Sequence, residues 1–150
     1  MKRGYTMILP QTIIDKLIAH AKEENPNECC GIVAGKNEEA TRVYRMTNTE
    51  KSPFRYRMDS KEQFNVQREI DEQEMKILAY YHSHTHTEAY PSATDIRMAI
   101  WNDTKEAIWP EVSYILISLM DNDYPQIKTF RILDGGKVVE VNFQTDTTIS

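Results

Sequence analysis

The stretch that decides how the rest of the chain is interpreted is ILAYYHSHTH, residues Ile77–His86. Its first half, Ile77–Tyr81, is an almost wholly apolar run of strand length. Such a run is typical of a central strand covered on both faces, because a strand with one face in water alternates apolar and polar residues. We therefore predict a buried strand over Ile77–Tyr81, followed by a histidine-containing loop that continues to Tyr90.

The chain before this strand alternates between helical and extended patterns. Apolar residues recur at helical spacing up to Glu24, and Pro26 ends the helix because proline disfavours helical geometry in the residue before it. Asp59 and Glu62 form a capping pattern at the start of a second helix. The expected elements are a helix over Gln11–Glu24, strands over Cys30–Ala34 and Thr41–Met46, a third strand marked by the alternation of Phe54, Tyr56 and Met58, and a helix from Asp59 to about Glu74.

The chain after the histidines predicts one more helix and three strands. Ser92 is a plausible N-cap for a helix that reaches Trp101. The strands are expected over Val112–Met120, Thr129–Leu133 and Val138–Phe143, with a hairpin at Asp134–Gly136. This mixture predicts an α/β (mixed α+β) single domain over residues 1–143, with residues 144–150 as a frayed tail.

The composition limits the possible function classes. The chain has 150 residues, with 18 Lys and Arg against 23 Asp and Glu, and a formal net charge of −5. The acidic balance argues against nucleic acid as a partner, because phosphates attract basic surfaces. The longest apolar stretch, Val112–Met120, is far shorter than the ~20 residues of a membrane-spanning helix, so no membrane partner is expected. Cys29 and Cys30 are adjacent, which indicates free thiols, and we expect a cytoplasmic protein.

The histidines that follow the strand suggest a metal site. Residues two apart in an extended chain point to the same side, so His82 and His84 can bind one cation, as can His84 and His86. Asp95, in the first turn of the next helix, can fold its carboxylate back toward the pair. Two histidines and one carboxylate are the ligands of an open catalytic zinc site.

Each part of this pattern also has a structural interpretation. A His-x-His pair can be a solvated turn, and Ser92 with Asp95 forms the Ser-x-x-Asp pattern of a helix start. A zinc hydrolase also needs a general base. Glu28 is the best candidate because it precedes an apolar strand, where a carboxylate is partly desolvated. The alternative for Glu28 is a surface residue after a helix end.

These residues together resemble a known family. Glu28 in Glu28–Gly35, then His82-Ser83-His84, then Ser92 and Asp95 in Pro91–Asp95, match every element of the JAMM (MPN-plus, Mov34/PAD-1) metalloprotease motif at its spacing. The order of the expected helices and strands is similar over nearly the whole chain. Two departures are Thr85, where many members have proline, and the additional His86.

The resemblance implies a fold, a site and a substrate class. The fold is a central mixed β-sheet flanked by helices, of cytidine-deaminase-like architecture. The site is a Zn²⁺ ion held by His82, His84 and Asp95, with Glu28 as general base and Ser92 as a hydrogen-bond donor to the tetrahedral intermediate. The activity is that of the compact prokaryotic branch: an isopeptidase or peptidase that cleaves after the C-terminal Gly-Gly of a ubiquitin-like or sulfur-carrier protein.

Two other functions are weighed beside this one. A catalytically silent MPN module would bind a partner and scaffold a complex, but such modules typically lack the metal ligands that are present here. A metal-dependent small-molecule amidase would use the same residues. For a Gly-Gly tail we expect extended docking on a strand edge, near Phe54–Met58 or along the loop Thr85–Tyr90.

Overall fold

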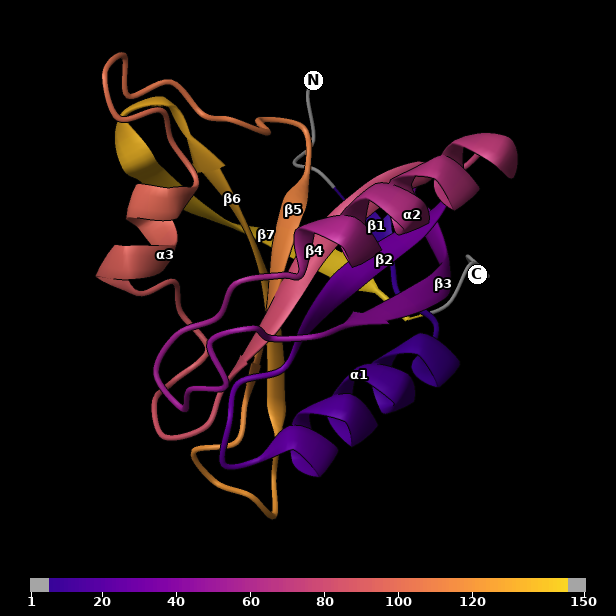
Figure 1. Ribbon diagram of the computed structural model, residues 1–150. Helices are drawn as coiled ribbons and strands as arrows, with labels where there is room; N and C mark the ends of the chain where they lie inside the picture. Colours follow the sequence, from indigo (N-terminus) through magenta and orange to yellow (C-terminus); the bar gives the residue numbers. More distant parts are fainter. Residues whose placement is uncertain (1–5, 146–150) are drawn as a thin grey trace.

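Seven strands and three α-helices make up residues 6–145, the part of the chain that the computed structural model describes (Figure 1). The strands close into a barrel in the order β1-β3-β2-β4-β5-β6-β7, with β1 pairing with both β3 and β7. The elements are β1 (Thr6–Ile8), α1 (Gln11–Glu24), β2 (Cys30–Lys36), β3 (Glu39–Met46), α2 (Ser60–Glu72), β4 (Lys76–His84), α3 (Ala93–Met98), β5 (Ser113–Ser118), β6 (Gln126–Leu133), a 3-10 turn (Asp134–Gly136) and β7 (Lys137–Gln144). The mixed α/β class expected from the sequence is confirmed.

The central strand is β4, as the apolar run predicts. It pairs antiparallel with β2 on one side and parallel with β5 on the other, and every residue from Leu78 to His84 is buried. The strand continues three residues beyond the predicted end at Tyr81, because His82 pairs with both Cys30 and Leu116, and His84 pairs with Ser118. The two histidines therefore lie on a strand with fixed backbone geometry, and not in a loop.

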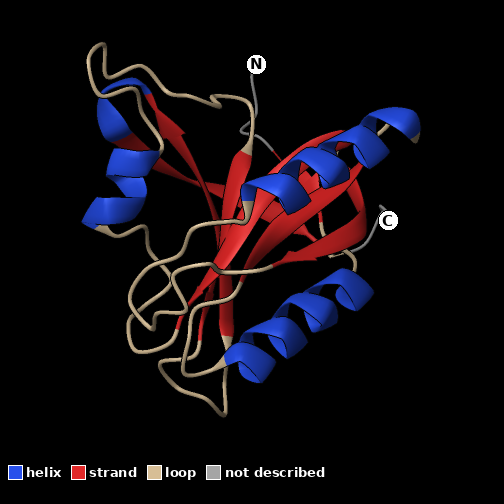
Figure 2. Ribbon diagram, in the orientation of Figure 1, coloured by secondary structure: helices blue, strands red, loops and turns tan. Residues whose placement is uncertain are grey.

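Each face of the sheet carries a large core cluster. On one face, α1 packs Ile14 and Leu17 against a cluster that includes Val33 and Tyr81. On the other face, Ile70 of α2 packs with Ile32, Tyr80, Tyr114 and Ile132. Figure 2 shows the helices outside the strands. His82 and His84 project from the same face as Tyr80, since alternate residues of a strand share a face.

One strand prediction was wrong. The segment that contains Phe54, Tyr56 and Met58 is a loop between β3 and α2, and its only ladder contact within the described residues is a single bridge from Met58 to Asn48. Its alternation has another cause: Tyr56 and Met58 pack against the α2-side core, while Phe54 is exposed. The helix α3 also ends at Met98, before the predicted Trp101, and Ile100 instead forms a bridge with Ala107.

The end of β7, the two cysteines and the helices bear on three further expectations from the sequence. Gln144 ends β7 and pairs with Ile8, while residues 146–150 of the expected tail lie outside the described residues. Cys29 and Cys30 are free and buried, and burial raises the pKa of each thiol to about 12, so both stay protonated. Among the described helices, none has the length and apolar character needed to cross a membrane.

Candidate metal and catalytic site

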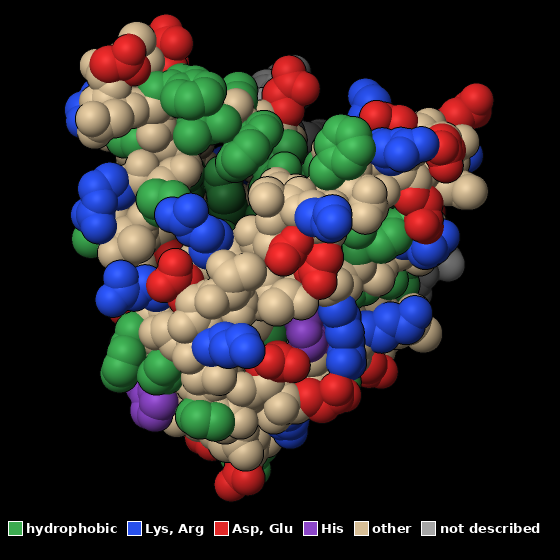
Figure 3. All heavy atoms as spheres, in the orientation of Figure 1, with side chains coloured by type: hydrophobic (Ala, Val, Ile, Leu, Met, Phe, Trp, Pro, Cys, Tyr) green, Lys and Arg blue, Asp and Glu red, His purple; other side chains and the backbone are tan. Residues whose placement is uncertain are grey.

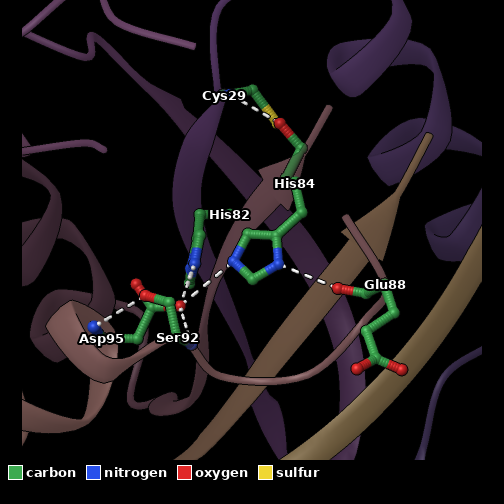
Figure 4. Close-up of polar contacts among 7 residues, drawn as sticks. Cys29, His82, His84, Glu88, Ser92 and Asp95 are labelled. Carbon is green, nitrogen blue, oxygen red and sulfur yellow. Dashed lines mark hydrogen bonds and ion pairs between the residues drawn. The ribbon is translucent and has the colours of Figure 1, made fainter. Parts of the chain in front are cut away.

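Two histidines of β4 and one carboxylate of α3 converge at the end of the central strand. His82 Nε2 lies 3.0 Å and His84 Nε2 lies 3.1 Å from the same oxygen, Oδ2 of Asp95 (Figure 4). The histidines are buried, and the Asp95 side chain is 13% exposed. Each residue offers one ligand atom, and the three atoms lie within 4.8 Å of one another. The site is therefore formed by the fold itself, and Asp95 is the most exposed of its three residues.

Hydrogen bonds determine which nitrogen of His84 faces this centre. His84 Nδ1 lies 2.9 Å from the carbonyl oxygen of Glu88, and a carbonyl can only accept, so Nδ1 carries the hydrogen. In neutral His84 the lone pair is then on Nε2, which points at an oxygen of a carboxylate. Two lone pairs that face each other repel unless a cation or a proton lies between them. The donor set thus fits a divalent metal, and zinc prefers these ligands together with this type of outer hydrogen bond.

The charges around the site agree with the placement of a cation there. Burial alone would raise the pKa of Asp95, but His82, His84 and the backbone N–H of Ser92 hold that pKa well below its usual range. Burial lowers the pKa of His82. The pKa of His84 is raised, because the contacts with Asp95 and Glu88 outweigh the effect of burial. Asp95 therefore stays ionised at neutral pH and can bind a cation without first losing a proton.

Glu28 approaches the same centre from the start of β2. It is 5% exposed, and its backbone N–H donates to Ser52 O at 2.9 Å. The next residue, Cys29, donates its N–H to Ser83 Oγ at 2.8 Å, between the two histidines of β4 (Figure 4). Burial raises the pKa of Glu28 to about 8, with a smaller lowering by His84 and a smaller raising by Asp95. A carboxyl with a pKa near neutrality is suited to accept and return a proton.

The raised pKa of Glu28 makes the stability of the metal-free protein depend on pH. The folded state holds this proton more tightly than the unfolded state, so stability is lost as the pH rises from 4.5, the ordinary value, to about 8. Glu28→Gln is neutral at every pH. It is expected to stabilise the metal-free protein by on the order of 1 kcal/mol or more at pH 8.5, and little at pH 4.5. Urea unfolding with chelator at both pH values measures this, and an equal difference at both would contradict the assignment.

Asn48, which the sequence analysis did not single out, connects Glu28 to the loop before α2. Its Nδ2 donates to Glu28 O at 3.0 Å and to Arg55 O at 3.1 Å. Its Oδ1 accepts from the backbone N–H groups of Glu50 at 3.0 Å and Arg57 at 3.1 Å. The buried amide thus uses its full hydrogen-bonding capacity. The same loop places the ring of Tyr56 on that of His82, with centroids 4.4 Å apart.

Replacing Asn48 should therefore affect both stability and catalysis. Asn48→Asp has the same shape but loses both donors, which leaves buried carbonyls unpaired and costs about 1–3 kcal/mol of unfolding free energy. Displacement of Glu28 by a fraction of an ångström is expected to lower kcat as well, by up to about 10²-fold. Urea unfolding and steady-state rates test this beside Asn122→Ala, an exposed asparagine of the β5–β6 turn, which should change neither.

Ser92 lies at the start of α3, where it has the structural role that the Ser-x-x-Asp pattern predicts. Its Oγ accepts from Asp95 N at 3.0 Å, and Asp95 Oδ2 accepts from Ser92 N at 2.9 Å, which completes a capping box. The hydroxyl hydrogen of Ser92 is not used by this bond and remains available as a donor. The cap also fixes the carboxylate of Asp95 beside the histidines.

His86 does not belong to the cluster. It is exposed, and its Nδ1 lies 2.8 Å from Thr85 Oγ1. Thr85, the residue after β4, is buried and donates to Pro53 O at 3.4 Å. This hydrogen bond links the end of β4 to the loop before α2.

The match to known proteins covers most of the chain. Residues 10–133 match the model of the prokaryotic homologs of the JAB domain. The chain belongs to this family. It is 36% identical over 138 residues to the CysO-cysteine peptidase of Mycobacterium tuberculosis (strain H37Rv), covering 91% of this chain and 89% of that protein. The resemblance to the JAMM/MPN family is thereby confirmed.

Two further proteins are similar to this chain over most of its length. The chain is 31% identical over 99 residues to a probable TtuB-protein conjugate cleaving protease of Thermus thermophilus, covering 65% of this chain and 66% of that protein. A solution structure of a protein from Desulfitobacterium hafniense superimposes with a TM-score of 0.77 at 32% identity, and covers 91% of this chain and 90% of the other. The fold shared with that protein thus extends over nearly the whole described chain.

Proposed function

We propose that this protein is a zinc-dependent peptidase that hydrolyses the bond after the C-terminal Gly-Gly of a ubiquitin-like or sulfur-carrier protein. The observation that carries the proposal is the convergence of His82, His84 and Asp95 beside a buried glutamate whose pKa is about 8. The relatives named as a CysO-cysteine peptidase and a TtuB-conjugate protease support this substrate class. The free, buried cysteines fit a reducing compartment, and the cytoplasm is the proposed location.

In the proposed reaction each residue of the motif has one task. His82, His84 and Asp95 would hold the metal ion, which when bound would lower the pKa of water and polarise a carbonyl. The carboxylate of Glu28 takes a proton from the attacking water and passes it to the nitrogen of the leaving group. The water oxygen bonds to the carbonyl carbon, the C–N bond breaks, the amine leaves with the transferred proton, and the carrier leaves with a C-terminal carboxylate. The family match at residues 10–133 lies within the peptidase domain proposed for residues 1–143.

The hydroxyl of Ser92 is proposed to donate a hydrogen bond to the oxyanion of the tetrahedral intermediate. Ser92→Ala then removes two functions at once. Loss of the cap costs about 0.5–2 kcal/mol of stability, and loss of an oxyanion donor lowers kcat by about 10²–10³-fold. Ser92→Asp can cap the helix without donating, so it should recover thermal stability but not the rate. Recovery of the rate by Asp would show that capping is the only role of Ser92.

A cleavage assay with peptides tests the proposed function as a whole. Tagged peptides that end in Gly-Gly-Cys are incubated with the protein in its zinc-loaded form and after treatment with chelator. We expect cleavage after the second glycine, its loss with chelator, and its return with zinc. Equal cleavage of Gly-Gly and Val-Gly peptides would argue for a broader peptidase or amidase, and binding without cleavage would argue for a scaffold.

A further inference from the structure

A pocket adjoins the metal site at His82 and Asp95. Its volume is about 530 Å³, and it extends from His82 and Asp95 to Tyr80, Tyr114 and Trp109. In Figure 3 a hollow bordered by hydrophobic side chains lies between α3 and α2. Two glycines have no side chains to fill a space of this size, which is in the range of pockets that bind small molecules or large side chains. The Gly-Gly pair alone therefore leaves this pocket without an occupant.

The lining of the pocket indicates what it binds. The rings of Tyr80 and Trp109 lie with their centroids 4.9 Å apart and their planes tilted by 47°, and Met98 of α3 and the ring of Tyr114 add further apolar surface. Tyr114 is also 8% exposed, and its buried hydroxyl has no hydrogen-bond partner within residues 6–145. A buried hydroxyl without a partner is costly. Polar side chains, among them Arg55, Arg57 and Asp59, also line the pocket, but the rings of Tyr80, Trp109 and Tyr114 form an apolar part of its wall. This part, with the unpartnered Tyr114 hydroxyl beside it, suits an apolar side chain attached to a polar backbone.

The position of Glu28 indicates which half of the substrate enters the pocket. Glu28 must lie near the leaving nitrogen in order to return the proton, and neither Glu28 nor His84 lines the pocket. The leaving group thus lies on the side of the metal centre where Glu28 and His84 are, away from the pocket. The carrier tail, on the other side of the scissile bond, extends past His82 toward Tyr80.

The spacing of the strands identifies the residue of the tail. Tyr80 pairs with Tyr114, and His82 pairs with Leu116, so the aromatic floor lies two residues along β4 and β5 from the metal ligand. Two residues of strand span about 6.6 Å, and an extended tail has the same rise per residue. With the last glycine beside His82, the residue that precedes the Gly-Gly pair lies above Tyr80 and Tyr114.

We propose that this pocket, bounded by Tyr80, Met98, Trp109 and Tyr114, selects carrier tails that have a large apolar side chain immediately before Gly-Gly, with the Tyr114 hydroxyl donating to a backbone carbonyl of the tail. The proposal rests on the proposed function. It adds a pocket that discriminates by side chain to the extended docking of the tail that is expected from the sequence. Leucine before Gly-Gly is expected to increase kcat/KM by about 10- to 100-fold over alanine at that position.

A binding experiment tests the pocket separately from catalysis. The chain has two tryptophans, and Trp101→Phe leaves Trp109 as the only one. In the Glu28→Gln, Trp101→Phe protein, peptides ending in Leu-Gly-Gly-Cys or Ala-Gly-Gly-Cys are titrated while Trp109 fluorescence is followed. We expect the leucine peptide to bind about 10- to 100-fold more tightly and to change the Trp109 emission. Equal affinity of the two peptides, or no binding of either, would overturn the proposal.

A kinetic experiment with matched variants gives the second test. Trp109 is 39% exposed and Trp101 is 52% exposed, but only Trp109 lines the pocket. Trp109→Ala is expected to reduce the preference for leucine over alanine to a few-fold, whereas Trp101→Ala should retain it. If Trp109→Ala does not fold, Met98→Ser serves in its place, because Met98 is exposed. This variant should also reduce the preference for leucine over alanine. Tyr114→Phe should lower kcat/KM for both peptides by the same factor. It removes the hydrogen bond to the backbone of the tail but leaves the apolar walls of the pocket in place.

The two proposals can fail separately. If the wild-type protein cleaves both peptides at the same rate, the side-chain selection is overturned and the peptidase function stands. If it cleaves neither peptide but still binds the leucine peptide more tightly, the pocket is supported and the peptidase function fails.

Discussion

Replacing Glu28 with Gln is expected to lower kcat by about 10²–10⁴-fold while the zinc content remains that of the wild-type protein. The amide keeps the size of the side chain but cannot accept the proton of the attacking water. Glu28 is not one of the three residues whose ligand atoms converge, so its replacement should not release the metal. Single-turnover rates and elemental analysis of the same sample measure the two quantities together.

The matched control for this variant is Glu88→Gln. Glu88 lies close to the site, but it contacts His84 through its backbone carbonyl, and its side chain points away from the histidine ring (Figure 4). The same chemical change there should leave kcat within about twofold, since surface substitutions have small effects. A loss of less than tenfold in Glu28→Gln would mean that Glu28 has only a structural role.

The second large effect is expected from the metal ligands. His84→Ala and Asp95→Ala each remove one of three converging ligand atoms, and should lower zinc affinity by more than about 100-fold, because even changes in the residues that support a ligand cost 10–100-fold. Activity should be lost with the metal. Elemental analysis and competition with a chromogenic chelator give the affinities.

His86→Ala provides the comparison within the same loop. His86 is exposed and bonds to Thr85, outside the cluster, so this variant should keep its zinc and most of its activity. Full zinc occupancy in both His84→Ala and Asp95→Ala would contradict the ligand assignment. Loss of zinc in His86→Ala alone would move the site to His84 and His86.

The sequence predicted the central part of the fold because that part depends on local patterns. The apolar run Ile77–Tyr81 has the length and continuity of a strand covered on both faces. In the structure β4 lies between β2 and β5. The end of β4 was not predicted, because polar residues such as His82 and Ser83 extend a strand only when partners from distant segments pair with them. Alternation around Phe54–Met58 was misleading, because a loop that packs on a core can show the same period as a strand.

The sequence predicted those residues of the candidate site that belong to a motif. It did not predict the residues whose role depends on contacts between distant segments. The five motif residues were named from the sequence and from its resemblance to the JAMM motif, and the structure places His82, His84 and Asp95 together. The role of Asn48 depends on four backbone groups from three places in the loop and from Glu28, which no local pattern encodes. The pocket is likewise formed by strands, α3 and a loop, so its size and apolar lining emerge only in the folded chain.

The most direct test of the account is the exact mass of the products formed from a carrier protein whose C-terminal Gly-Gly is joined through an amide bond to cysteine. The zinc-loaded protein should release free cysteine and a carrier that ends at the second glycine with a carboxylate, and the Glu28→Gln protein should leave the adduct intact over the same time. An unchanged adduct with the zinc-loaded wild-type protein, or cleavage at another bond, would contradict the account.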